Sequence, residues 1–126
     1  MIMNSKFLLI GLATAVSVSG CEGKRYIDSE VNFPDSSAQL IVQTEPYGGG
    51  AGASYESVSL IRGSDREEVL SARSLYPIRH TISEDGMEVE LIVCSGRIFS
   101  HKQSSNVPYG PAAPVRIRST VKPCSE

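Results

Sequence analysis

The histidines and paired carboxylates are the side chains of this sequence that could carry acid and base chemistry. His80 and His101 are its only histidines, and neither has an Asp, Glu or Cys in local metal-ligand spacing. The sequence therefore predicts no metal site. Glu88 and Glu90 form the clearest carboxylate pair, with Arg79 on the same hairpin. We interpret them as solvated, charge-balanced residues rather than as a catalytic acid and base.

Two short patterns have the spacing of known catalytic or nucleotide-binding motifs but lack the elements that those motifs need. Ser119 and Lys122 have the Ser-x-x-Lys spacing of penicillin-binding enzymes, yet residues three apart on a strand point to opposite faces. Residues 48–53 have the glycines of a dinucleotide-binding loop, but no helix follows them. We therefore expect a hairpin loop at residues 48–53, no cofactor and no enzyme activity.

Two tyrosines in Gly- and Pro-rich loops are candidate binding residues. Tyr47 lies between Pro and Gly, as does Tyr109 in the longer loop that covers residues 104–114. Aromatic residues in such loops often form binding surfaces, although turn chemistry alone also explains the pattern. Arg116 and Arg118 point to one face of the strand that follows, and they form a second candidate surface.

Alternating apolar and polar residues predict strands over most of the chain after residue 38. The clearest hairpin is residues 78–93, where Asp85-Gly86 is a two-residue turn that sets Ile82 opposite Val89 and His80 opposite Leu91. Further strands are predicted at residues 39–43, 55–62, 97–101 and 115–122, the last with Val115, Ile117 and Val121 facing inward. Residues 65–73 fit a strand or a capped helix, and we prefer the strand.

The number and spacing of these segments define the expected fold class. Six to seven short strands separated by Gly, Pro and Ser turns predict an all-β domain. We expect a small antiparallel β-sandwich or barrel with one disulfide.

The first 21 residues carry an export signal. Lys6 precedes an uncharged apolar run, residues 7–16, that is too short to span a bilayer. Val18-Ser19-Gly20-Cys21 then resembles the lipobox of bacterial lipoproteins at all four positions. The resemblance implies cleavage before Cys21 and a covalent lipid on its sulfur. A non-lipidated signal with a chance cysteine and a buried apolar first strand are the alternatives.

The resemblance also implies where the mature protein lies. Removing residues 1–20 from the 126 leaves 106, enough for one domain, and the loss of Lys6 changes the net charge from −2 to −3. This mild acidity disfavours nucleic acid as a partner. We expect a lipidated N-terminus and flexible tether over residues 21–37 and a periplasmic domain over residues 38–126. Glu22, where lipoproteins kept at the inner membrane tend to have Asp, favours anchoring to the outer membrane.

The two remaining cysteines are expected to pair. With Cys21 lipidated, Cys94 and Cys124 are the only thiols left, and an oxidising periplasm favours a disulfide between them. Two buried free thiols are the alternative. Such a bridge suggests that residues 97–101 pair antiparallel with residues 117–121.

These features favour a non-catalytic binding module over an enzyme. The expected partner, besides the membrane that holds the lipid, is a protein or an envelope polymer. The alternative is an inhibitor or immunity lipoprotein directed against a hydrolase or toxin that acts in the periplasm. Residues 52–55, Gly-Ala-Ser-Tyr, are similar to the Ser-Gly-x-x-Tyr loop of lysozyme inhibitors, but the small residues stand in another order.

Overall fold

The computed structural model describes residues 26–45 and 54–125, and every regular element in these ranges is a strand. This confirms the all-β class and places residues 65–73 in a strand. Within the described ranges, no helix has the length and apolarity to cross a membrane. The strands are β1 (Tyr26–Asn32), β2 (Gln39–Glu45), β3 (Ser54–Arg62), β4 (Asp65–Ser74), β5 (Tyr76–Ile82), β6 (Glu88–Cys94), β7 (Arg97–His101), β8 (Ser104–Ser105) and β9 (Val115–Lys122).

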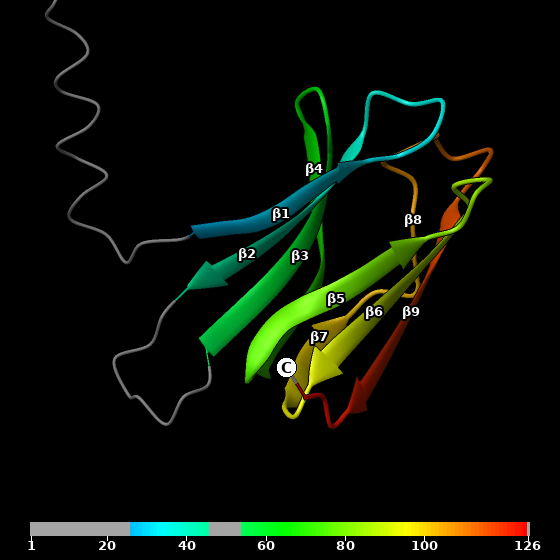
Figure 1. Cartoon of the computed structure of the whole chain (residues 1–126). Helices are drawn as coiled ribbons and strands as arrows, with labels where there is room; N and C mark the ends of the chain where they lie inside the picture. Colours follow the sequence, from blue (N-terminus) through cyan, green and yellow to red (C-terminus); the bar gives the residue numbers. More distant parts are fainter. Residues whose placement is uncertain (1–25, 46–53, 126) are drawn as a thin grey trace, which may run out of the picture.

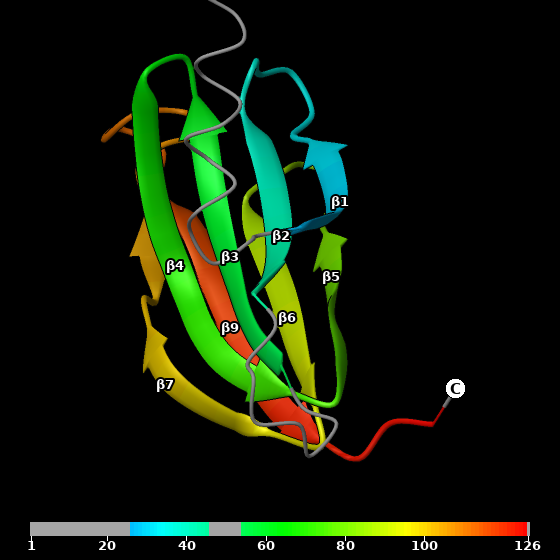
Figure 2. The same ribbon diagram turned by 90° about the vertical axis from the view of Figure 1, so that its left-hand side faces the viewer.

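The strands form two sheets that pack face to face (Figures 1 and 2). The first sheet has the order β1-β2-β3-β4-β7, and the second has the order β5-β6-β9-β8. All paired strands are antiparallel except β6 and β9, which are parallel. The fold is a sandwich rather than a closed barrel, because each sheet keeps two edge strands.

Strand β1 corrects the prediction of a flexible tether over residues 21–37. Residues 26–32 pair with β2 along their length, with a bulge between Ile27 and Ser29. Phe33, also placed in the tether by the sequence analysis, is a buried core residue. The prediction failed because β1 forms an edge strand with mostly exposed side chains, which leaves no clear apolar alternation to read.

The β5–β6 hairpin has the predicted register. Ile82 lies opposite Val89 and His80 opposite Leu91, as expected. The turn itself is centred one residue earlier than predicted, because the Gly86 amide donates to the Ser83 carbonyl at 2.9 Å and Gly86 takes the positive φ of 76°. The alternation of apolar residues and the glycine therefore act together to select one register.

The pairing predicted for the last strand is wrong. Strand β9 lies parallel to β6, and β7 pairs with β4 in the first sheet. The chain changes sheets at the turn after β6, where Ser95 has a φ of 54° and Gly96 packs on the Arg73 carbonyl. A Cβ at Gly96 would lie 1.8 Å from that oxygen, so the turn needs a glycine.

One residue of β9 is not buried as predicted. Val115 and Ile117 face the core as expected, but Val121 is 44 % exposed. Val121 is the second-last residue of β9, and the side chains of this strand become more exposed toward that end.

The predicted disulfide between Cys94 and Cys124 is present, with the two Cα atoms 5.1 Å apart. Cys94 is the last residue of β6, and its register partner is Lys122, the last residue of β9. The bridge therefore joins the ends of two parallel neighbours. We call this end of the sandwich, where β1 also begins and β2 ends, the disulfide end.

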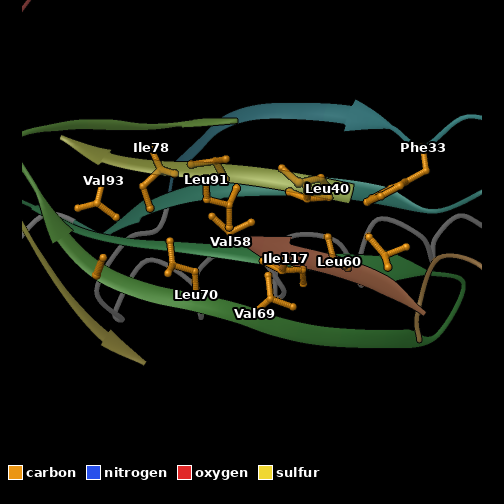
Figure 3. Close-up of a cluster of buried hydrophobic side chains, with 14 of the residues drawn as sticks. Phe33, Leu40, Val58, Leu60, Val69, Leu70, Ile78, Leu91, Val93 and Ile117 are labelled. Atoms are coloured by element: carbon orange, nitrogen blue, oxygen red, sulfur yellow. The ribbon is translucent and has the colours of Figure 1, made fainter. Parts of the chain in front are cut away.

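The core lies between the inner faces of the two sheets (Figure 3). Leu40, Val58 and Leu60 come from the first sheet, whereas Ile78 and Leu91 come from the second. These positions alternate along their strands, as the sequence pattern predicts. Burial of aliphatic side chains from both sheets stabilises the sandwich.

Tyr109 holds the turns together at the opposite end of the sandwich. We call this the loop end, and it contains residues 33–38, 62–65, 83–88 and 106–114. The Tyr109 hydroxyl donates to the Pro34 carbonyl, and its ring meets the Phe33 ring edge on, with centroids 6.2 Å apart. Gly86 leaves room for that hydroxyl, since a Cβ there would lie 2.1 Å from it.

The residue before Tyr109 adds two further links at this end. The Pro108 carbonyl accepts hydrogen bonds from Ser36 Oγ at 2.8 Å and from Arg62 Nη1 at 3.0 Å. Segments distant in sequence thus hold loop 106–114 in a single position.

Replacing Tyr109 with phenylalanine tests this role. We expect Tyr109→Phe to lower the free energy of unfolding by about 1 kcal/mol, because the ring stays packed and only the hydroxyl hydrogen bond is lost. Urea denaturation measures the change. The control Tyr26→Phe alters an exposed tyrosine and should change stability by less than about 0.5 kcal/mol. Equal losses of stability in the two variants would contradict the role assigned to the Tyr109 hydroxyl.

Candidate functional site

Only some of the predicted binding residues lie where a partner could reach them. Tyr109 is partly buried, and its ring and hydroxyl both serve the fold of the loop end. Burial raises the pKa of its hydroxyl, with Asp35 and Asp85 adding to the rise. Tyr47, residues 48–53 and Cys21 fall outside the described residues. Arg116 and Arg118 are therefore the candidate binding residues that the structure exposes.

The two arginines stand side by side on the outer face of β9. Their side chains are 74 % and 62 % exposed, and both approach the same carboxylate, Glu88, at 3.9 Å and 3.3 Å. Ion pairs this exposed are weak, so the guanidinium groups can exchange Glu88 for another carboxylate at little cost. Glu88 is thus paired with these arginines rather than with Arg79, which instead donates to the Ser125 carbonyl at 3.0 Å.

A groove of about 490 Å³ runs along β9 beside these arginines. Its polar lining consists of His101, Gln103, Arg116, Arg118, Ser119 and Thr120. None of the residues that line it, all within the described range 101–120, is acidic. The groove therefore offers two cations and several hydrogen-bonding groups to a partner, and Glu88, the carboxylate that both arginines approach, lies outside its lining.

The backbone of β9 is open along the same groove. Arg116 donates its N–H to the Met87 carbonyl on the β6 side, and Ile117 donates to the Gln103 carbonyl on the other side. Alternate residues of a strand direct their backbone groups to the same side, so the N–H and C=O of Ser119 point into the groove. Strand β8 pairs with β9 only at residues 115–116, so it does not reach Ser119.

The histidines have different surroundings. His80 lies on the inner face of β5, where its Nε2 is 3.1 Å from Ser29 Oγ, and burial lowers its pKa. It is the hydrogen-bonded, partly buried histidine that its place in the apolar pattern predicts. His101 is exposed and lines the β9 groove.

The sequence analysis missed a buried acidic residue, Glu56. Its side chain is 3 % exposed, and its Oε1 has no hydrogen-bond partner among the described residues. Burial raises its pKa from 4.5 to about 7, against the lowering effect of the Thr44 hydroxyl, and the charge of Asp28 adds to the rise. The signal was present in the sequence, because Glu56 shares the alternation of Val58 and Leu60 and so must point inward.

Thr44 connects Glu56 to a second carboxylate. Its Oγ1 is 2.6 Å from Glu56 Oε2 and also bonds Asp28. A hydroxyl has one proton and can donate to only one of these acids, so the other contact needs a proton from a carboxyl group. Protonated Glu56 satisfies both contacts by donating to Thr44, which then donates to Asp28. Below about pH 7 this cluster therefore keeps a proton on Glu56.

Neither a metal site nor a known relative gives a further clue to function. Among residues 26–45 and 54–125, no three His, Cys, Asp or Glu side chains are grouped so that they could hold a metal ion. Comparison of the chain with protein-family models, curated proteins and solved structures finds no match. The proposals below therefore rest on the residues and their geometry.

The raised pKa of Glu56 predicts how stability depends on pH. The folded state binds the proton of Glu56 more tightly than the unfolded state does. The contribution of this proton to the free energy of unfolding is therefore fully present below pH 4.5 and is lost as pH rises through about 7. We expect the free energy of unfolding to fall by roughly 3 kcal/mol by about pH 8. Glu56→Gln should remove this dependence, as measured by urea denaturation across the pH range.

A matched carboxylate gives the control for this experiment. Glu68 is exposed on the neighbouring strand β4, and Glu68→Gln should leave the dependence unchanged. If Glu56→Gln kept the full loss of stability between acid and neutral pH, another group would be responsible.

Proposed function

We propose that this protein is a lipid-anchored protein of the bacterial envelope whose domain binds an extended, acidic polypeptide in the β9 groove. The acid-free groove beside an open strand edge is the observation that carries the binding part of the proposal. The lipobox-like residues 18–21 support the anchor. The Cys94–Cys124 disulfide fits an oxidising compartment outside the cytoplasm.

The anchor is tested by the mass of the mature protein. Expressed with its own signal in a bacterial host, the chain should lose residues 1–20 and gain the mass of diacylglycerol and a further acyl chain at Cys21. Intact-mass spectrometry measures this, and Cys21→Ser should abolish the added mass. A product that keeps residues 1–20, or that carries no lipid, would refute the anchor.

The open edge of β9 suggests how a partner binds. An extended peptide can add to a sheet edge through main-chain hydrogen bonds, here to the backbone of Ser119. Its side chains would alternate between the two faces of the sheet. Those on the outer face would lie next to Arg118 and Thr120, whereas those on the inner face would lie on the side of Ile117. The groove therefore favours a sequence that alternates acidic and apolar residues.

The arginines favour carboxylates over other polar groups. A guanidinium group can hold a carboxylate through two parallel hydrogen bonds, which a neutral side chain cannot match. Because Arg116 and Arg118 share only Glu88, a second carboxylate can join the pair without displacing a strong interaction. Binding of this kind is expected to weaken as the salt concentration rises.

A peptide of alternating Glu and Val, labelled with fluorescein, is the probe for this site. We expect it to bind the mature protein and to lose roughly tenfold in affinity with Arg116→Gln/Arg118→Gln, because two interacting cations are removed. Fluorescence anisotropy measures both affinities. A peptide of alternating Lys and Val has the same length and strand propensity but should not bind.

A second double variant controls for the change in net charge. Arg66→Gln/Arg79→Gln removes two exposed arginines that do not line the groove, so it should bind the Glu–Val peptide as the unchanged protein does. Similar losses in both double variants would mean that net charge, not the groove, attracts the peptide. Equal binding of the two peptides would also refute the proposed preference.

A further inference from the structure

The large exposed apolar side chains gather at one end of the sandwich. Among the described residues, five large hydrophobic side chains are between 43 % and 54 % exposed: Tyr26, Ile27, Leu75, Phe99 and Val121. All five lie in the half of the molecule that includes the disulfide end. Exposed apolar residues that cluster in this way mark an interaction surface more often than single ones do.

The strand register places three of these residues at the same end of the first sheet, on its two edge strands. Tyr26 pairs with Thr44, and the row continues through Glu56 and Ala72 to Ile98. Ile27 begins the next row, which ends at Ser100. Phe99 lies between Ile98 and Ser100, so it stands at the opposite edge of the same two rows. Figure 1 shows the starts of β1, β3 and β5 on the same side of the sandwich.

The other two residues lie beside the disulfide in the second sheet. The Leu75 amide donates to the Cys94 carbonyl at 2.9 Å, at the corner between β4 and β5. Val121 pairs with Val93, the residue before Cys94. The apolar side chains of both sheets therefore belong to the disulfide end.

Charge differs between the two ends of the sandwich. Exposed Arg73, Arg97 and Lys122 lie at the disulfide end together with one exposed acid, Asp28, and the Arg97 guanidinium stands 5.7 Å from the centre of the Phe99 ring. The turns of the loop end carry four exposed acids, Asp35, Asp65, Glu84 and Asp85, and one exposed cation, Arg62. Cations beside apolar and aromatic side chains are typical of surfaces that rest at a membrane interface.

The length of chain before β1 brings this same end to the membrane. Only residues 22–25 separate Cys21 from Tyr26, and two of them are Lys24 and Arg25. Five residue steps can span at most about 18 Å. A lipid on Cys21 therefore holds the start of β1, and with it the disulfide end, close to the headgroups.

We propose that the disulfide end docks on the phospholipid surface through Leu75, Phe99 and the neighbouring cations, so that the loop end points away from the membrane. This inference rests on the proposed lipid anchor for its orientation. The exposed apolar residues and the charge distribution support it independently, because they would favour an anionic bilayer even without a lipid on Cys21.

The absence of tryptophan from the sequence allows a direct test with single reporters. Leu75→Trp places one reporter at the disulfide end, and Ser64→Trp places the matched control in the exposed β3–β4 turn of the loop end. Each lipidated protein is reconstituted into vesicles of phosphatidylethanolamine and phosphatidylglycerol that contain brominated phospholipid. We expect quenching and a blue shift for Leu75→Trp and neither for Ser64→Trp. An anchored protein with equal, unquenched emission from both reporters would overturn docking and leave the anchor intact.

The unlipidated mature protein, Cys21→Ser, separates docking from the anchor. It should sediment with vesicles that contain phosphatidylglycerol more than with vesicles of phosphatidylcholine alone. Leu75→Ser/Phe99→Ser in this background should lower that binding roughly fivefold or more, while circular dichroism shows that the fold is kept. Binding unaffected by the double substitution would overturn the proposal. So would a dimer of the Cys21→Ser protein that the same substitutions abolish, because the surface would then bind a second copy of the chain.

Discussion

Strand β9 lies parallel to β6, and much of the molecule's surface depends on this pairing. The chain leaves the second sheet after Cys94, where Gly96 packs directly on a carbonyl of β4 and allows β7 to join the first sheet. Strand β9 then fills the place beside β6 that a simple hairpin would have taken. The disulfide to Cys124 joins the ends of these two parallel strands and closes a loop of sequence separation 30.

The same pairing creates the groove and orients its arginines. Because β7 belongs to the first sheet and β8 is only two residues long, β9 keeps an open edge over its second half. Arg116 and Arg118 point outward beside this edge with one carboxylate between them. In contrast, the loop around Tyr109 is held by hydrogen bonds to other turns, so it is part of the scaffold.

Local patterns in the sequence predicted the elements better than the contacts between them. Alternation identified the inner faces of β3, β5, β6 and the first half of β9, and the turn at Gly86 selected the hairpin register. Glu56 could have been found in the same way, since it alternates with Val58. The failures are β1, whose exposed edge has no clear alternation, and Val121, whose exposure depends on which strands lie across from it.

The sequence by itself determined most of the strand positions, most of the buried faces and the partners of the disulfide, because each depends on residues close together in the chain or on a very small set of cysteines. Only the tertiary structure decided that β6 and β9 are parallel, that Glu56 lies next to Asp28, and that the exposed apolar side chains share one end. These features depend on contacts between distant segments. Such contacts are set by how two twisted sheets pack together, which no local pattern records.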